Sequence, residues 1–466
     1  MSLSRSNFLD FWDRARSGYW LVPSVIVVIA AVAAFGLIWL DRHLMRLGTD
    51  SPLWLGDLQP GAAQAILSTI ASSMITVAGV VFSITIVALQ LASTQFGPRL
   101  LRTFMVDTGT QVVLGTFVAT FLYCLVVLGA LGGEDNFVPQ YAATGGVVLG
   151  LLNIGVVIYF IHHIANAIRV ENVIQALADE IREAIDTLFP EEIGHEPLPE
   201  QSPGRRDLPK DFVRDARPIP SRGEGYIRHV DETSLMEIAE EKNLLLRLDH
   251  DPGDFVMEGT VLISAWPRDR VDEDTATRLC ESVVLGPQRT PLQDVGFAVQ
   301  QLVEVGVRAL SRAFNDPFTA VACVDRLGHA LCRLALRRLP SPYRYDDRGR
   351  LRVVVRPITL VGLTARALDP IARSGGDNVQ VVVHLIKAVL LVARHARQAA
   401  DRKWLLNLAR TLREDGEARI GRDRDRRILA EEYEAAMARF QTDQRSLTLV
   451  PSTAAKDLPE PAEPDA

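Results

Sequence analysis

A stripe of polar and small side chains lies within the longest part of this chain that carries no charged residue. That part runs from Leu58 to Pro98 and exceeds the roughly 20 residues that a helix needs to cross a bilayer. At the helical period the stripe covers an arc of about 80°. It consists of Ser68, Ser72, Thr76, Gly79, Ser83, Gln90 and Thr94. Hydroxyl and amide groups in this pattern can line a passive pore for ions or water.

The same stripe also suits contact between helices. Small and hydroxyl residues are the usual material of helix interfaces in membranes, and Ser and Thr can bond to the carbonyl of the preceding turn. Ser68, Ser72 and Thr76 follow one another at four-residue spacing, with Gly79 in line. Packing is the more general explanation of such a stripe, so the sequence leaves both interpretations open.

Two arginines follow the stripe. Gln90 and Thr94 lie near one end of the predicted span, and Arg99 and Arg102 come directly after it. A polar mouth with positive side chains favours anions over cations. The alternative is that both arginines reach phosphate headgroups from the membrane boundary.

A second polar group lies in the soluble half, at Asn315, Asp316 and Thr319. Asn can adopt the left-handed conformation, Asp316 can cap a helix, and Pro317 can open one. This order favours a tight helix–helix corner. The alternative is a site for a polar ligand or ion, since the free N–H groups of a helix start attract anions, although the carboxylate of Asp316 repels them.

No pattern typical of catalysis occurs. The chain has no nucleophile elbow, phosphate loop, dinucleotide glycine pattern or His/Glu metal motif. Its four cysteines form no CxxC pair and have no histidines at zinc spacing, so buried free thiols in a reducing compartment are expected. We therefore expect no enzyme activity, no cofactor and no metal. The pair His162–His163, at the end of a predicted span, is expected to reach the interface rather than to bind metal or sense pH.

The elements that position the stripe are membrane helices. Long apolar runs crowd the part of the chain before Arg169, and Arg, Asp and Glu crowd the rest. We predict a transmembrane domain over 1–168 with spans at about 22–40, 62–91, 111–131 and 141–162. No Asp, Glu, Lys or Arg falls within these spans, which argues against a pump or a proton-coupled carrier.

The arginines also give an orientation. The amino-terminal segment, the loop after the second span and everything after the fourth span carry arginine, whereas the loop after the third carries only Glu134 and Asp135. The positive-inside rule then places both termini in the cytoplasm, although Arg42 and Arg46 oppose it. The bilayer and further copies of the chain are the expected partners. Nucleic acid is not expected, because charges of both signs are mixed in the soluble half.

The soluble half is predicted to be α+β. We expect a stalk helix and linker over 169–222, a small β-rich module over 223–268, a mostly helical domain over 269–445 and a disordered tail over 446–466. Pro252–Leu262 resembles a hairpin of barrel-sandwich modules, which modify a lysine at a hairpin tip. The hairpin has no lysine, and the nearest is Lys242, so the resemblance implies the small β fold without carrier activity.

One helix start is marked strongly in the helical domain. Thr290 to Gln293 form a capping box with proline at the first helical position. This pattern predicts a helix that continues to about Ala313. A further apolar run, Val381–Val392, is interrupted by His384 and Lys387 and is too short to span a bilayer, so we expect a core helix.

Several long segments resemble one family at once. They are Thr76–Ser93, Gln95–Arg99, Val113–Phe121, Gln288–Asp294 and Asn315–Ala320. The family is that of bacterial predicted membrane proteins catalogued as domain of unknown function 2254. Ser311–Phe314 departs from the Ser-Pro-Gly-like approach to Asn-Asp-Pro. The resemblance implies a location in the bacterial inner membrane and no established activity.

Two hypotheses follow. The first is an oligomeric passive channel. The second span lines its pore, and the cytosolic domain has a sensing or gating role. The second is a membrane-anchored sensor or scaffold protein without conduction, in which the stripe serves packing. A stripe that faces the spans of its own chain favours packing, whereas one that faces outward leaves the pore open.

Overall fold

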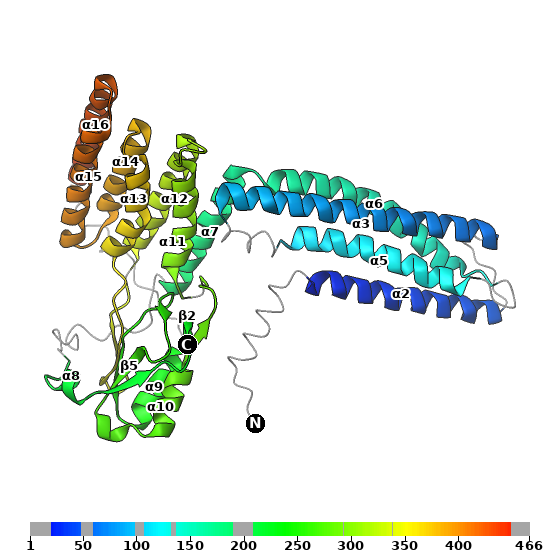
Figure 1. Ribbon diagram of the computed structural model, residues 1–466, viewed down its shortest axis with the longest axis horizontal. Helices are drawn as coiled ribbons and strands as arrows, with labels where there is room; N and C mark the ends of the chain where they lie inside the picture. The colour runs from blue at the N-terminus through cyan, green and yellow to red at the C-terminus, as the bar shows by residue number, and fades with distance from the viewer. Residues whose placement is uncertain are drawn as a thin grey trace, which may run out of the picture. The chain divides into compact units, whose positions relative to one another are not determined.

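The structure is a computed structural model in which two compact units, Met1–Val173 and Ile174–Ala466, divide the chain close to the boundary expected at 168 (Figure 1). Each unit is described here by itself. The structure describes residues 20–47, 59–97, 107–131, 137–189, 208–291, 293–337 and 339–448.

The first unit contains four helices that are long and apolar enough to cross a membrane. They are α2 (Leu21–Arg46), α3 (Pro60–Phe96), α5 (Thr108–Ala130) and α6 (Gln140–Ala167). Each overlaps one of the four predicted spans. The helices extend past most of the predicted ends because capping and backbone hydrogen bonds, rather than hydrophobicity, decide where a helix stops.

The helix α5 is the centre of this unit, because α2, α3 and α6 all pack against it. Its approach to α2 is close: a Cβ atom at Gly115 would lie 2.9 Å from the Cα atom of Pro23. On α6, Gly146 faces Leu67 of α3 and Tyr123 of α5. Glycines at these crossings let the helix backbones approach one another, as is common in membrane bundles.

A charged side chain, Asp41, lies in the part of α2 that extends beyond the predicted first span. Asp41 is buried, and its two carboxylate oxygens accept hydrogen bonds of 3.0 Å from the backbone N–H groups of Tyr141 and Ala142. These N–H groups belong to the first turn of α6, whose own N-cap residue, Pro139, offers no side-chain acceptor. Asp41 therefore caps a helix that begins 100 residues later in the chain.

The stalk helix expected after residue 169 is a helix separate from the fourth candidate span. The helix α6 ends at Ala167, and a separate helix, α7 (Val170–Leu188), follows after Ile168 and Arg169. One face of α7 is apolar and buried, and Ile174, Leu177 and Ile181 lie on it. Near its end, Asp186 accepts hydrogen bonds from the guanidinium groups of Arg333 and Arg337 at 2.7–2.8 Å. This helix is thus part of the second unit's fold.

Two small sheets form the β-rich part of the second unit. One has the strand order β1-β5-β3-β8-β7 and the other β4-β2-β6. The strands are β1 (Arg217–Pro220), β2 (Gly225–Val230), β3 (Leu245–Leu248), β4 (Phe255–Val256), β5 (Val261–Trp266), β6 (Val283–Gly286), β7 (Tyr343–Tyr345) and β8 (Leu351–Val354). Short helices accompany them: α8 (Phe212–Asp215), α9 (Glu232–Glu241), a 3₁₀ turn (Arg268–Arg270) and α10 (Glu273–Glu281).

The sheets draw on more of the chain than the expected module over 223–268. Strand β8 pairs in parallel with β3, although about 100 residues of chain separate them, and β6 pairs with β2. Both β6 and β8 come from the region expected to be mostly helical. Parallel pairing needs a long crossover, and the chain between β3 and β8 passes through several strands and helices, so local sequence patterns carry no sign of the pairing.

The rest of the second unit is helical. Its helices are α11 (Val295–Ala309), α12 (Pro317–Leu336), α13 (Leu360–Gly375), α14 (Val379–His395), α15 (Ala399–Arg419) and α16 (Asp423–Thr448). The core helix expected around Val381–Val392 is α14, whose apolar side chains are largely buried. The expected tail over 446–466 lies outside the described residues, apart from the last turn of α16.

The predicted start of α11 is wrong. Its N-cap is Asp294, whose carboxylate accepts a hydrogen bond from the N–H of Phe297, and not Thr290. The side chain of Gln293 instead pairs with both the N–H and the C=O of Val230 on β2, at 2.8 and 3.1 Å. Because that side chain is bonded to the backbone at the last residue of β2, the predicted capping box does not form.

Candidate functional site

The polar stripe lies on the outer face of α3. All seven residues of the stripe, from Ser68 to Thr94, are exposed in the single chain. A Cβ atom added to Gly79 would meet no atom within 4 Å. At the helical period, the centre of the stripe lies roughly 160° from the centre of the buried face of α3. The stripe therefore points away from the other described helices of its own unit.

The face of α3 that packs within the unit is made of other residues. Ala63, Ala71, Ala78, Ala88 and Ala92 are buried there, together with larger residues such as Leu67 and Val81. Packing of the stripe against α5 or α6, the general explanation of such a pattern, is not what the structure shows.

Four hydroxyl groups of the stripe have partners within α3. Ser68 donates to the carbonyl oxygen of Ala65, Ser72 to that of Thr69, and Thr76 to that of Ser72, at 2.8–3.1 Å. The hydroxyl of Thr94 donates to Leu91 in the same way. Because each hydroxyl oxygen keeps an accepting lone pair, these groups can contact water, another helix or a permeating ion.

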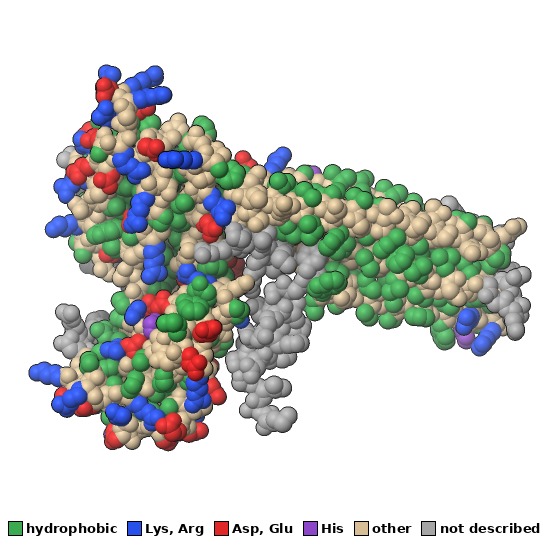
Figure 2. Space-filling view, in the orientation of Figure 1, with side chains coloured by type: hydrophobic (Ala, Val, Ile, Leu, Met, Phe, Trp, Pro, Cys, Tyr) green, Lys and Arg blue, Asp and Glu red, His purple; other side chains and the backbone are tan. Residues whose placement is uncertain are grey.

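Other outer faces of the first unit have a different chemistry. On α2 the most exposed large side chains include Val28, Val32 and Phe35, and on α6 they include Leu151 and Ile158, all at least 60% exposed. In the face that Figure 2 shows, hydrophobic side chains cover much of the long helices, whereas charged side chains of both signs cover the second unit. Bulky apolar faces suit lipid. The stripe on α3 differs from these faces because its side chains are small or polar.

A polar pair lies inside the first unit and was missed by the sequence analysis. Asn153 of α6 is fully buried and donates hydrogen bonds of 2.8 Å to the hydroxyl of Thr120 on α5 and to the carbonyl of Leu149. Its side-chain oxygen has no hydrogen-bond partner among the described residues. One asparagine in an apolar run is a weak signal, because the sequence does not show whether it faces lipid or protein.

One end of the first unit carries a histidine–carboxylate contact. His163 of α6 lies with Nε2 2.7 Å from the Oδ2 atom of Asp107, while Nε2 of His162 lies 2.8 Å from the amide nitrogen of Asn166. His163 thus has a polar partner that lies 56 residues earlier in the chain, which the sequence analysis did not indicate. Arg99 and Arg102, the proposed mouth, lie outside the described residues.

The corner at Asn315, Asp316 and Thr319 joins α11 to α12. Asn315 has φ +47°, in the left-handed region, and Pro317 opens α12. The carboxylate of Asp316 accepts hydrogen bonds from the N–H groups of Phe318 and Thr319 and from the hydroxyl of Thr319, at 3.1, 3.1 and 2.6 Å. The donors that an anion would need are occupied by the protein's own carboxylate.

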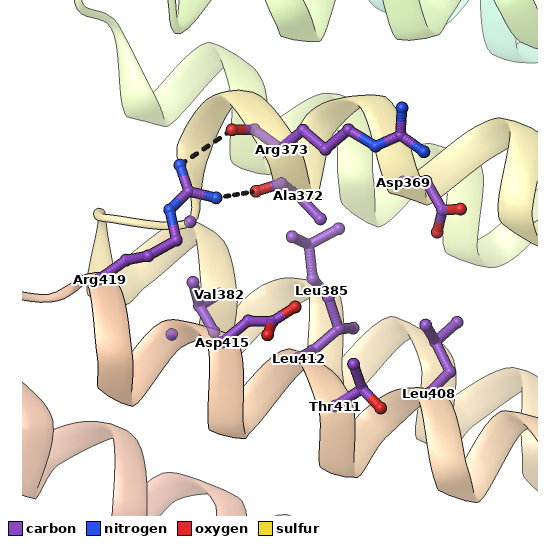
Figure 3. A pocket seen from close by; sticks show the side chains of 12 residues that line it. Asp369, Ala372, Arg373, Val382, Leu385, Leu408, Thr411, Leu412, Asp415 and Arg419 are labelled. Carbon is purple, nitrogen blue, oxygen red and sulfur yellow. Dashed lines mark hydrogen bonds between the residues drawn. The ribbon is translucent and has the colours of Figure 1, made fainter.

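A shallow cavity of about 280 Å³ lies among α13, α14 and α15. Figure 3 shows Asp369, Asp415, Arg373 and Arg419 around an apolar floor that includes Leu385. Burial raises the pKa of Asp369, and the nearby guanidinium of Arg373 opposes this. Because the two arginines balance the two carboxylates, the lining has no net charge that would select a ligand.

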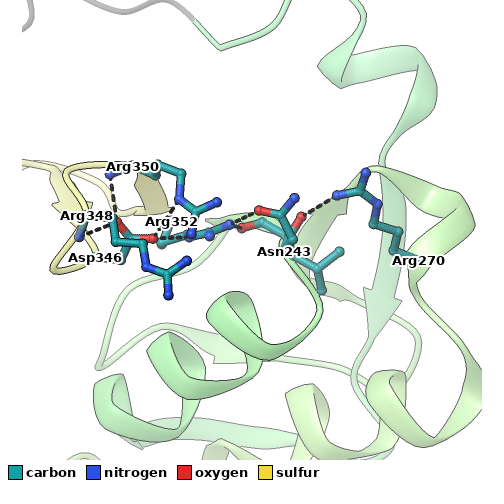
Figure 4. A network of polar contacts seen from close by, with 7 residues as sticks. Asn243, Arg270, Asp346, Arg348, Arg350 and Arg352 are labelled. Atoms are coloured by element: carbon teal, nitrogen blue, oxygen red, sulfur yellow. Dashed lines mark hydrogen bonds and ion pairs between the residues drawn. The ribbon is translucent and has the colours of Figure 1, made fainter.

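A polar network fixes the β7–β8 hairpin to the rest of its sheet (Figure 4). Arg352 is buried; it donates from Nε to Asp346 at 2.9 Å and from Nη1 to the side chain of Asn243 at 2.7 Å. Asp346 also accepts hydrogen bonds from the N–H groups of Arg348 and Arg350. The network holds strand β8 beside β3 and is structural. Among the residues that the structure describes, no three His, Cys, Asp or Glu side chains form a group that could hold a metal ion.

Comparison with known proteins gives a family and relatives of unknown activity. The family described as predicted membrane protein (DUF2254) matches residues 16–390. The uncharacterized proteins Mb1321c of Mycobacterium bovis and Rv1290c of Mycobacterium tuberculosis are each 32% identical to this chain over 348 residues. The match covers 73% of this chain but only 64% of each relative. No solved structure matches the chain.

Proposed function

Because the chain belongs to the family described as predicted membrane protein (DUF2254), we propose that copies of it assemble in the bacterial inner membrane around α3 and form a passive channel. The stripe from Ser68 to Thr94 lines the conducting path. Both termini and the second unit lie in the cytoplasm, where the second unit senses a signal or gates the path. The chain acts without catalytic chemistry and without a cofactor.

The observation that carries this proposal is the direction of the stripe. Hydroxyl and small side chains make few favourable contacts with lipid. In membranes, surfaces of this composition are usually buried by close contact with another helix. Several α3 helices around a common axis would remove the stripe from lipid and leave its hydroxyl groups facing one another or water. Hydroxyl groups of this kind form parts of known channel linings.

The chemistry of the stripe favours passive conduction. No Asp, Glu, Lys, Arg or His occurs within α3, so the path offers no group that could carry a proton or bind a coupled ion tightly. Arg99 and Arg102, which follow α3 in the sequence, would favour anions at the cytosolic mouth. We therefore expect anions to permeate better than cations.

A specific observation favours a second candidate, a membrane-anchored sensor or scaffold protein without conduction. The hydroxyl groups of Ser68, Ser72 and Thr76 already bond to carbonyl oxygens of α3, so they do not require water. In that case the stripes of two copies pack together directly and leave no path.

Conductance of the purified protein in planar bilayers distinguishes the channel from the non-conducting sensor or scaffold protein. The proposal predicts a current that is abolished when Ser72, Thr76 and Ser83 are together replaced by Leu, because three larger apolar side chains close and dry the path. The matched control replaces Val28 and Val32 on the outer face of α2 by Leu and is expected to keep the current. Absence of current under voltage, tension and osmotic challenge would rule out the channel.

A further inference from the structure

A histidine and a carboxylate join the ends of two candidate spans at one end of the first unit. Asp107 is the N-cap residue of α5, and its carboxylate accepts hydrogen bonds from the N–H groups of Gly109 and Thr110 at 3.3 and 3.0 Å. His163 lies in the last turns of α6, with Nε2 2.7 Å from Oδ2 of the same carboxylate. One carboxylate thus serves both the start of α5 and the end of α6.

The surroundings hold the imidazole of His163 in place. Its ring stacks on Tyr159, with 5.4 Å between ring centroids, and the Tyr159 hydroxyl lies 3.5 Å from Nδ1. A Cβ atom at Gly109 would lie 2.8 Å from Nε2 of His163, so only glycine leaves room for the ring against the first turn of α5. The side chains of His163 and Asp107 are 25% and 30% exposed, which leaves protons access to the pair.

We propose that Asp107 and His163 form a proton-sensitive latch that fastens the end of α6 to the first turn of α5. When the imidazole is protonated, the contact is an ion pair with a charge-assisted hydrogen bond; when it is neutral, an ordinary hydrogen bond remains. The latch is tight when the imidazole is protonated and loosens when the imidazole is neutral. It holds the point where the chain leaves α6, and it acts whether or not α3 lines a pore.

Among the described residues of the first unit, few other charged or titratable side chains lie near the ends of α5 and α6 that the latch joins. On α6 the titratable neighbours are Tyr159 and His162, and Arg169 and Glu171 follow the helix in the chain. The described length of α3 contains no titratable side chain, and the charged and histidine residues of α2 all lie beyond Leu40, toward its carboxyl-terminal end. Asp107 is therefore the carboxylate that can stabilise a protonated His163 among the described residues of α5, its N-cap and α6.

Hydrogen exchange of the full-length protein in lipid nanodiscs tests the latch, with rates corrected for the intrinsic effect of pH. The amides of Gly109 and Thr110 report on it directly. We expect them to be about fivefold better protected at about pH 5.5 than at about pH 8, which is the difference between a charge-assisted and a neutral hydrogen bond. His163→Gln is expected to remove this dependence on pH.

Two further variants keep the test decisive if His163→Gln fails to fold. Asp107→Asn keeps a good N-cap residue for α5 but removes the charge, so it should also lose the dependence on pH. His162→Gln, the matched control, should keep it, because His162 contacts Asn166 and not Asp107. Equal dependence on pH in the wild type and Asp107→Asn, no dependence in the wild type, or its loss in His162→Gln would each overturn the proposal.

Discussion

At the scale of single residues, the serines and threonines of α3 explain why the sequence left the stripe open. A hydroxyl group that bonds to its own helix can lie in lipid, in water or against another helix without an unsatisfied donor. Residue type therefore does not tell these settings apart. Only the positions of α5 and α6, which bury the alanine face of α3, show that the stripe points outward.

Other functional residues were hidden because their partners are remote in the chain. Asp41 and the N–H groups it caps are about 100 residues apart, and Asp107 and His163 are 56 apart. The Asp-Thr-Gly-Thr order at 107–110 could have marked the start of α5, because Asp is a preferred N-cap residue. No local pattern could have indicated His163 as its second partner.

The Asp346–Arg352 pair gives a prediction at this scale. Both side chains are nearly fully buried, and removal of one member of such a pair leaves an uncompensated charge. Asp346→Asn is expected to lower the free energy of unfolding by about 3–5 kcal/mol, measured as a shift of the thermal unfolding midpoint in detergent. Asp347→Asn, at the exposed neighbouring position, is the control and should change little. Equal midpoints for Asp346→Asn and the wild type would show that the pair contributes no stability.

The same pair predicts a dependence on acid. Burial alone would raise the pKa of Asp346, but the N–H of Arg350 and the guanidinium of Arg352 outweigh it and lower the pKa. Its stabilising effect is thus complete above the pKa of an unfolded carboxyl group and is lost as the pH falls through the lower value of the folded state. Lowering the pH should therefore reduce the difference in thermal unfolding midpoint between the wild type and Asp346→Asn. A difference that grows as the pH falls would contradict this assignment.

At the scale of elements, the sequence predicted the spans and several parts of the soluble half well. The start of α12 at Pro317 and the core helix α14 lie where expected, because N-cap residues, proline and apolar runs are local signals. The start of α11 was wrong, since the side chain of Gln293 is used by strand β2.

Two glycines in the first unit provide a matched pair. At Gly115 an added Cβ atom would lie 2.9 Å from the backbone of Pro23, whereas at Gly79 it would meet nothing within 4 Å. Gly115→Ala is therefore expected to destabilise the packing of α2 on α5 by about 1–3 kcal/mol, measured by thermal unfolding in detergent. Gly79→Ala should leave the stability of the single chain unchanged or slightly higher, because Ala favours helix. A larger loss for Gly79→Ala than for Gly115→Ala in monomeric protein would contradict the outward direction of the stripe.

At the scale of the whole molecule, the division into an apolar helical unit and a charged α+β unit could be predicted from composition alone. The extent of the sheets could not, because β8 pairs with β3, which lies about 100 residues earlier in the chain. The assembly of copies is a property of a surface, and a sequence without its fold does not show which surface is left unpacked. The account therefore depends on the outward face of α3 being shared between copies.

The most direct test is a cysteine scan along α3, read as the change in bilayer current when a water-soluble thiol reagent is added. The partly exposed Cys280 is first replaced by Ser, since the other three cysteines are buried. The account predicts that modification reduces the current at Ser68→Cys, Ser72→Cys, Thr76→Cys and Ser83→Cys, and not at Ala71→Cys or Ala78→Cys, which pack within the unit. A current that no stripe position alters, or no current at all, would contradict it.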